Sequence, residues 1–137
     1  MAKIIFLQQI WFPLGGVMTL SAALKNAGHE TRIAIGDEQK ILREIKDYNP
    51  DLICFPIITP FRSFMARMSL FLKESGIKSL IVVGGYDASF FPEIIEKTPI
   101  DILCRGEGED ALVELANAID NGKDYSKIKN LWIKKNE

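Results

Sequence analysis

The feature that most constrains the fold of this chain is a regular alternation of short apolar runs with longer amphipathic stretches. The apolar runs are rich in isoleucine, leucine and valine and occupy residues 3–7, 31–35, 51–58, 79–83 and 100–104. Most of them are continuously apolar, which is typical of parallel strands buried on both faces. Because helical stretches separate the runs, the pattern predicts an α/β protein whose sheet is covered by helices on both faces.

The stretches between the apolar runs repeat their own apolar residues at helical spacing. They predict helices over residues 17–27, 41–48, 64–72, 92–95 and 112–119, and a last short strand over 131–133. Short loops and right-handed crossovers leave few possible topologies. We therefore predict a three-layer, flavodoxin-like (Rossmann-like) parallel sheet of about five strands in the order 2-1-3-4-5. Residues 1–137 form a single domain in this interpretation, and 131–137 are expected to lead to a missing second domain.

Composition and charge exclude several classes of function. The formal net charge is −1 and the 17 basic residues form no dense run, so the chain lacks the electrostatic footprint of a nucleic-acid-binding protein. No apolar stretch approaches the roughly 20 residues that a membrane helix needs, and the first strand begins too early for a signal peptide. Cys54 and Cys104 lie within apolar runs, which indicates buried thiols in a reducing compartment. We expect a cytoplasmic protein with no nucleic-acid or membrane partner.

The predicted topology also selects the place where a ligand binds. In an open parallel sheet, ligands bind outside the carboxyl ends of the strands, where the strand order reverses. Four predicted loops meet at that edge, at residues 8–16, 57–63, 84–89 and 105–110. The first loop contains Trp11 and Phe12, whose exposure is costly unless a cofactor or a partner domain covers them. The site is therefore expected to accept a large and largely apolar ligand.

The same loops lack the residues that other ligands of this fold require. The first turn offers only Gly15-Gly16, not the Gly-x-Gly-x-x-Gly of a dinucleotide site, and the chain has no Gly-Lys-Ser/Thr phosphate loop. Gln8 and Gln9 stand where a phospho-accepting receiver domain needs acidic residues. The only histidine, His29, follows a predicted helix at the opposite edge of the sheet, where a surface position is expected. Catalytic triads, zinc sites and histidine-ligated cobalt therefore lack a key residue.

Five sequence motifs follow one another in an order that resembles one known family. They are Pro13-Leu14-Gly15-Gly16, Ala27-Gly28-His29-Glu30, Asn49-Pro50-Asp51-Leu52-Ile53, Val82-Val83-Gly84-Gly85 and Arg105-Gly106-Glu107-Gly108-Glu109. The resemblance covers roughly residues 3–134, and it is to the cobalamin-binding domains that precede radical S-adenosylmethionine (SAM) domains. The chain departs from that family at Pro56, where a serine is common, and at Tyr86-Asp87, where proline and histidine are common.

The resemblance implies a domain that holds cobalamin with its nucleotide tail extended into the crevice at the carboxyl edge. It also implies that no histidine of this chain binds the cobalt, because the Asp-x-His-x-x-Gly motif is absent. No catalytic residue and no metal ligand is expected in this chain. The candidate cofactor-binding residues are Gln9, Trp11, Phe12, Leu14, Gly15, Gly16, Ile58, Thr59, Gly84, Gly85, Tyr86, Arg105, Gly106 and Glu107.

The function that the resemblance implies is that of a cobalamin-binding module of a radical SAM enzyme, a methyltransferase above all or an enzyme of related radical chemistry. The iron–sulfur cluster and SAM would belong to a catalytic domain of the same parent protein, so this chain is not expected to catalyse the reaction alone. The alternative is a structural or docking domain that binds no cofactor. Under that alternative Gly84-Gly85 forms only a tight turn, and Trp11-Phe12 docks against another domain.

Overall fold

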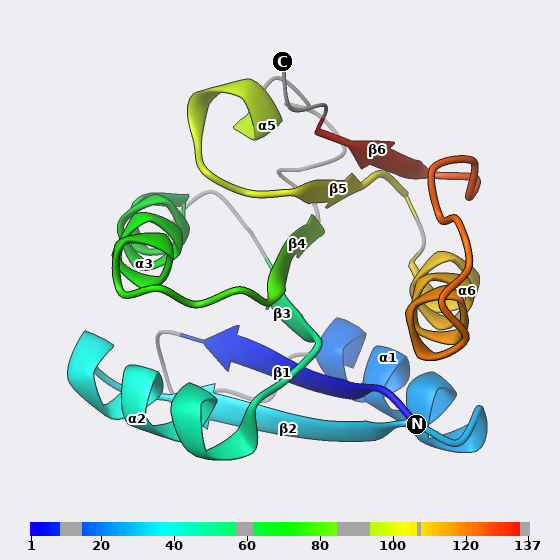
Figure 1. Cartoon of the computed structure of the whole chain (residues 1–137), viewed down its shortest axis with the longest axis horizontal. Coiled ribbons are helices and arrows are strands. Elements are labelled where there is room, and N and C mark those ends of the chain that lie inside the picture. The colour runs from blue at the N-terminus through cyan, green and yellow to red at the C-terminus, as the bar shows by residue number, and fades with distance from the viewer. Residues whose placement is uncertain (9–14, 57–61, 85–93, 107, 135–137) are drawn as a thin grey trace.

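The structure is a computed structural model that describes residues 1–8, 15–56, 62–84, 94–106 and 108–134. Strands and helices alternate along these residues (Figure 1). The strands are β1 (Lys3–Gln8), β2 (Glu30–Ile35), β3 (Leu52–Pro56), β4 (Leu80–Gly84), β5 (Ile102–Cys104) and β6 (Leu131–Ile133). The helices are α1 (Gly15–Asn26), α2 (Glu38–Tyr48), α3 (Arg62–Glu74), α5 (Ile94–Lys97) and α6 (Glu109–Asp120).

The described strands form one six-stranded sheet in the order β2-β1-β3-β4-β5-β6. The first five strands pair in parallel, which confirms the predicted order 2-1-3-4-5. β6 adds a strand that pairs antiparallel with β5, with Leu103 opposite Trp132. It runs antiparallel because residues 121–130 carry the chain back to the carboxyl edge of the sheet, where Asn130 accepts a hydrogen bond from the backbone N–H of Arg105 at 2.9 Å.

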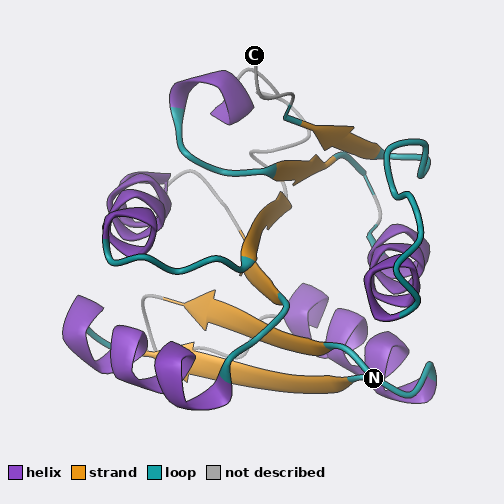
Figure 2. Ribbon diagram, in the orientation of Figure 1, coloured by secondary structure: helices purple, strands orange, loops and turns teal. Residues whose placement is uncertain are grey.

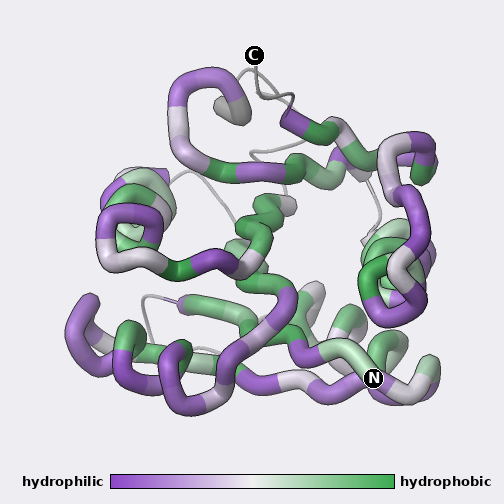
Figure 3. Tube along the Cα trace, viewed as in Figure 1, coloured by the Kyte–Doolittle hydropathy of each residue, from purple (hydrophilic) through white to green (hydrophobic). Residues whose placement is uncertain are grey.

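Helices cover both faces of the sheet (Figure 2). α2 and α3 pack on one face against a core that includes Ile5, Ile53 and Val83. α1 and α6 pack on the other face against a core that includes Phe6 and Val82. Figure 3 shows the inner strands as hydrophobic and the outer turns as mainly hydrophilic. The three predicted layers are therefore present, and successive side chains of one strand enter different cores.

The ends of α2 show how the local sequence sets the helix boundaries. Asp37 caps the first turn, because its carboxylate accepts the backbone N–H of Lys40 at 2.9 Å. Asn49 ends the helix in the left-handed conformation with a φ of 51°, and its N–H donates to the carbonyl of Ile45 at 2.8 Å. Among the described helices, none combines the length and the apolar character that crossing a membrane requires.

Candidate functional site

The carboxyl ends of the parallel strands define the candidate site. After β1 the chain enters α1 on one face of the sheet, and after β3 it enters α3 on the other, so the strand order reverses between β1 and β3. The four central parallel strands end at this edge with Gln8, Pro56, Gly84 and Cys104. This reversal is the position at which ligands bind to open parallel sheets.

Some of the predicted cofactor-binding residues fall within the described part of the chain, and these lie at the carboxyl edge. Gly15 and Gly16 begin α1, Gly84 ends β4, and Arg105 and Gly106 follow β5. The others lie outside the described residues: Gln9, Trp11, Phe12, Leu14, Ile58, Thr59, Gly85, Tyr86 and Glu107. The fold thus brings the described positions to one edge, while the contact of each residue with a cofactor stays a prediction.

Two of these glycines border open space. A Cβ atom at Gly16 would meet no heavy atom of the described residues within 4 Å, and Gly16 is exposed in the first turn of α1. Gly106 has a φ of +76°, which residues with side chains rarely adopt, and a Cβ there would also meet no atom within 4 Å in the part of the chain that the structure describes. A Cβ at Gly84 would instead lie 3.5 Å from Cβ of Cys104. The edge is therefore open at Gly16 and Gly106, whereas Gly84 packs against β5.

Three further residues converge beside this edge and were not selected from the sequence. A Cβ at Gly108, the residue before α6, would lie 3.4 Å from Sγ of Cys104 and 3.5 Å from Cδ2 of Leu20. Gly108 therefore lets the start of α6 lie close to both α1 and β5. Leu20 and Cys104 carry only the signals of core residues in the sequence, and Gly108 was visible only as part of a motif.

Both cysteines are free thiols in the core beneath α1 and α6, as predicted. Burial raises the pKa of Cys104 to about 11, and the carboxylate of Glu109 contributes to the shift. Burial also raises the pKa of Cys54, with a smaller contribution from Cys104. Both thiols are therefore protonated at neutral pH. Among the described residues no group of three potential metal ligands occurs.

Arg105 is oriented by β6. Its guanidinium carbon lies 4.7 Å from the centroid of the Trp132 ring, a cation–π contact. Trp132 pairs with Leu103, whose side chain belongs to the core beneath α2 and α3. Cys104 belongs to the core on the other face. The Arg105 guanidinium and the Cys104 thiol therefore lie at the same edge but on opposite faces of the sheet.

The single histidine lies away from this edge. His29 precedes β2, at the amino-terminal end of the parallel strands, as expected from the sequence. The expected surface position is wrong, because His29 is only 6% exposed. It is buried because both ring nitrogens bind protein groups. One accepts the backbone N–H of Ala2, just before β1, and the other forms a hydrogen bond with Asn117 on α6.

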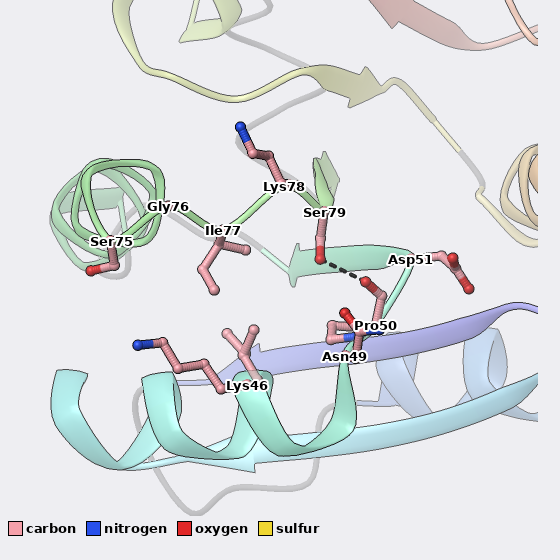
Figure 4. Close-up of a pocket in the computed structure, with 10 residues that line it drawn as sticks. Lys46, Asn49, Pro50, Asp51, Ser75, Gly76, Ile77, Lys78 and Ser79 are labelled. Atoms are coloured by element: carbon pink, nitrogen blue, oxygen red, sulfur yellow. Dashed lines mark hydrogen bonds between the residues drawn. The ribbon is translucent and has the colours of Figure 1, made fainter.

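A groove of about 460 Å³ lies at the amino-terminal edge, between the last turns of α2 and α3 (Figure 4). The residues that lead into β3 and β4 form its inner wall, where the hydroxyl of Ser79 donates to the carbonyl of Pro50 at 2.6 Å. None of the predicted cofactor-binding residues within the described ranges lines this groove. It is therefore separate from the candidate site.

Comparison with known families identifies the domain, because residues 6–116 match the family described as B12 binding domain. The chain belongs to the B12 binding domain family. The matched residues run from β1 into α6 and include the segments that follow β1, β3, β4 and β5. This match confirms the resemblance drawn from the sequence motifs.

Curated relatives of this B12 binding domain are much longer proteins. The chain is 27% identical over 131 residues to the anaerobic magnesium-protoporphyrin IX monomethyl ester cyclase of Synechocystis sp., covering 89% of the chain and 26% of the relative. The cyclase of the same name from Cereibacter sphaeroides is 30% identical over 125 residues, covering 80% and 19%. An uncharacterized methyltransferase of Pyrococcus horikoshii is 28% identical over 131 residues, covering 90% and 28%. The chain therefore spans roughly a fifth to a quarter of these relatives.

Solved structures share the fold of this domain. The radical SAM methyltransferase TsrM from Kitasatospora setae, with cobalamin and a 4Fe–4S cluster bound, superposes with a TM-score of 0.86 at 21% identity, over 98% of this chain and 27% of TsrM. The cobalamin-dependent SAM radical enzyme OxsB gives 0.77 at 20% identity, over 95% and 20%. A cobalamin-binding protein from Desulfitobacterium hafniense gives 0.64 at 15% identity, over 85% and 57%.

Proposed function

We propose that this B12 binding domain holds cobalamin at the carboxyl edge of its sheet, without a histidine ligand of its own, as the cobalamin module of a radical SAM enzyme. The observation that carries the proposal is the open space at Gly16 and Gly106, beside the strand-order reversal of a B12 binding domain. When bound, cobalamin supplies a cobalt centre for methyl transfer or related radical chemistry.

The positions and chemistry of the described side chains support the proposal that no residue of this chain binds the cobalt. His29 is bound to β1 and α6 at the opposite edge, so its imidazole is not available there. Cys104 lies near the edge, but its pKa of about 11 keeps the thiol protonated at neutral pH. In this proposal the role of the chain is to bind and orient the corrinoid, and Trp11 and Phe12 are the residues that would contact one face of its ring.

The reaction itself belongs, in this proposal, to a radical SAM domain of a longer protein. TsrM contains both cobalamin and an iron–sulfur cluster, and this chain superposes on only 27% of it. The cluster motif of radical SAM domains has three cysteines, whereas this chain has two, and both are buried in the sheet. The cluster and SAM are therefore assigned to the partner domain, and the chain to the capture and presentation of cobalamin.

The test is binding of hydroxocobalamin to the purified chain. We expect co-elution in gel filtration, with a visible spectrum in which the nucleotide base of cobalamin has left the cobalt. Folded protein that elutes without cobalamin would contradict the proposal and would favour the structural or docking domain. A spectrum with the base of cobalamin still on the cobalt would contradict a tail extended into the crevice.

A matched pair of substitutions on α1 locates the site. Gly16→Leu fills the open space at the carboxyl edge, and leucine also has the higher helix propensity. Ala22→Leu places the same side chain at an exposed position further along the helix. We expect Gly16→Leu to weaken cobalamin binding by about tenfold or more, with a folded circular dichroism spectrum. Equal affinity in the two variants would place cobalamin elsewhere.

A further inference from the structure

A second groove lies at the carboxyl end of β2, between the first turns of α2 and α3. Its volume is about 620 Å³, and small-molecule sites commonly enclose about 300–1,000 Å³. It opens at the same edge of the sheet as the candidate cofactor site, but over the α2 and α3 face. None of the predicted cofactor-binding residues that the structure describes lines it.

The walls of this groove carry two guanidinium groups from different helices. Arg43 comes from α2 and Arg67 from α3. Nε of Arg67 donates to the carbonyl of Ser63 at 3.4 Å, which leaves its terminal N–H groups for another acceptor. Within the described part of the chain neither arginine has a carboxylate partner. Two such groups beside one cavity suit an oxyanion that accepts several charge-assisted hydrogen bonds.

Two acidic residues also line the groove, and they set the charge of the ligand. The carboxylate of Asp37 accepts the N–H of Lys40 as the cap of α2, so it is already bound. Among the described residues no hydrogen bond holds the carboxylate of Glu38, and its negative charge offsets part of the positive charge of the two arginines. The charges of the four charged residues that line the groove cancel, and the helix N-terminus that Asp37 caps adds about half a positive charge. That balance favours a monoanion such as a carboxylate over a phosphate dianion.

The floor of the groove is apolar and fixed. Phe64 is 8% exposed and Met68 is 1% exposed, and both belong to the core beneath α3. The ring of Phe64 meets that of Phe55 edge to face, with centroids 6.1 Å apart. Because Phe55 and the core beneath α3 hold the ring of Phe64, its position does not depend on a ligand. Only a small part of this floor is open to a ligand, and that part is the exposed edge of Phe64.

We propose that this groove binds a small organic carboxylate with an apolar body, at a site distinct from that of the cofactor. Arg43 and Arg67 bind the carboxylate, and the exposed edge of Phe64 contacts the apolar body. The proposal stands on this groove alone and is independent of whether cobalamin binds.

The probe is phenylacetate, added to the ¹⁵N-labelled chain and followed by NMR. We expect saturable shifts at the backbone amides of residues 36–39 and at the Nε–H groups of Arg43 and Arg67. Phenylacetamide has the same shape without the charge and should bind at least about tenfold more weakly. Arg43→Gln and Arg67→Gln should each weaken phenylacetate binding by about tenfold. Lys46→Gln, on the same helix but lining the amino-terminal groove, is the control that leaves affinity unchanged.

Three results would overturn the proposal, each measured on variants whose circular dichroism matches that of the wild type. The first is equal binding of phenylacetate and phenylacetamide. The second is unchanged affinity in both arginine variants, or no saturable shift at residues 36–39. The third is tighter binding of phenyl phosphate than of phenylacetate, which would replace a carboxylate by a phosphate ester as the ligand class.

Discussion

Nε2 of His29 lies 2.7 Å from Oδ1 of Asn117, although 88 residues separate the two in the sequence. On the other side of the ring, the backbone N–H of Ala2 donates to Nδ1 at 3.0 Å. Because Nδ1 is an acceptor, Nε2 carries the hydrogen and donates to Asn117. The imidazole therefore joins the start of β1 to α6 at the amino-terminal edge of the sheet.

We predict that His29→Ala destabilises the fold without changing cobalamin chemistry. The substitution leaves the buried N–H of Ala2 without its acceptor and removes the link to Asn117, which should lower the free energy of unfolding by about 1–3 kcal/mol. Asn117→Ala keeps the Ala2 bond and should cost less. Urea unfolding measures both effects. The visible spectrum of bound cobalamin should be the same in His29→Ala as in the wild type, and a changed spectrum would identify His29 as a cobalt ligand.

A second prediction concerns Asp101, which directly precedes β5 and joins it to α3 and β4. Its Oδ2 accepts hydrogen bonds from Nζ of Lys73 and from the backbone N–H of Ile81, both at 2.8 Å. Asp101→Ala should lower the free energy of unfolding by about 1–3 kcal/mol, since the amide of Ile81 loses its partner. Lys73→Met removes only a partly exposed ion pair and should cost less than about 1 kcal/mol. Equal losses in urea unfolding would show that the ion pair, not the amide bond, dominates.

The order of the parallel strands was predictable because each buried strand is a continuous apolar run and each crossover contains a helix. The direction of β6 was not. A run of only three apolar residues, 131–133, does not indicate whether the strand pairs parallel or antiparallel. The direction depends on how residues 121–130 return along α6 and place Asn130 beside Arg105. That path is set by tertiary packing, which sequence periodicity does not report.

The position of the candidate site at the carboxyl edge could be predicted from the topology, but the residues that meet beside it could not. Leu20, Cys104 and Gly108 meet through the packing of α1, α6 and β5. In the sequence they are a helical apolar residue, a strand residue and one glycine of a motif. The burial of His29 was missed for the same reason, since its partner Asn117 is distant in the sequence. Contacts between elements that are far apart in the sequence could not be predicted from the sequence alone.

A third prediction is that Tyr48→Phe stabilises the domain. The Tyr48 hydroxyl is buried and has no hydrogen-bond partner among the described residues. The ring itself lies under two cations, 4.4 Å from the guanidinium of Arg32 and 5.5 Å from Nζ of Lys3. Phenylalanine keeps the ring and removes the unsatisfied group, so the free energy of unfolding should rise by about 1 kcal/mol. A loss of stability in urea unfolding would mean that the hydroxyl does have a partner.

The same residue gives a pH dependence with a definite sign. Burial, and then the carboxylate of Glu30, raise the pKa of Tyr48 from 10.0 to about 12. The unfolded chain therefore loses this proton at lower pH than the folded chain, and stability falls as pH rises from about 10 to about 12. Tyr48→Phe should lose less stability than the wild type over this interval. Parallel curves for the two proteins would contradict the raised pKa.

The last prediction concerns the two thiols and bears directly on the cobalt ligand. A thiol with a pKa of about 11 is thiolate in only about one molecule in a thousand at pH 8, against about a quarter for a free cysteine. We expect Cys104 in the folded chain to react with iodoacetamide at least about a hundredfold more slowly than in urea. The rate should rise about tenfold per pH unit up to about pH 11.

Single-cysteine variants separate the two sites, with labelling followed by mass spectrometry. Cys54→Ser leaves Cys104 as the only thiol. Cys104→Ser leaves Cys54, whose pKa burial raises further, so Cys54 should react more slowly still. Rapid labelling of Cys104 at pH 8 would mean that the carboxyl edge presents a thiolate to solvent. Cobalt at that edge would then have a soft ligand within this chain, and the proposal of an unligated cobalt face would fail even if cobalamin binds where Gly16 predicts.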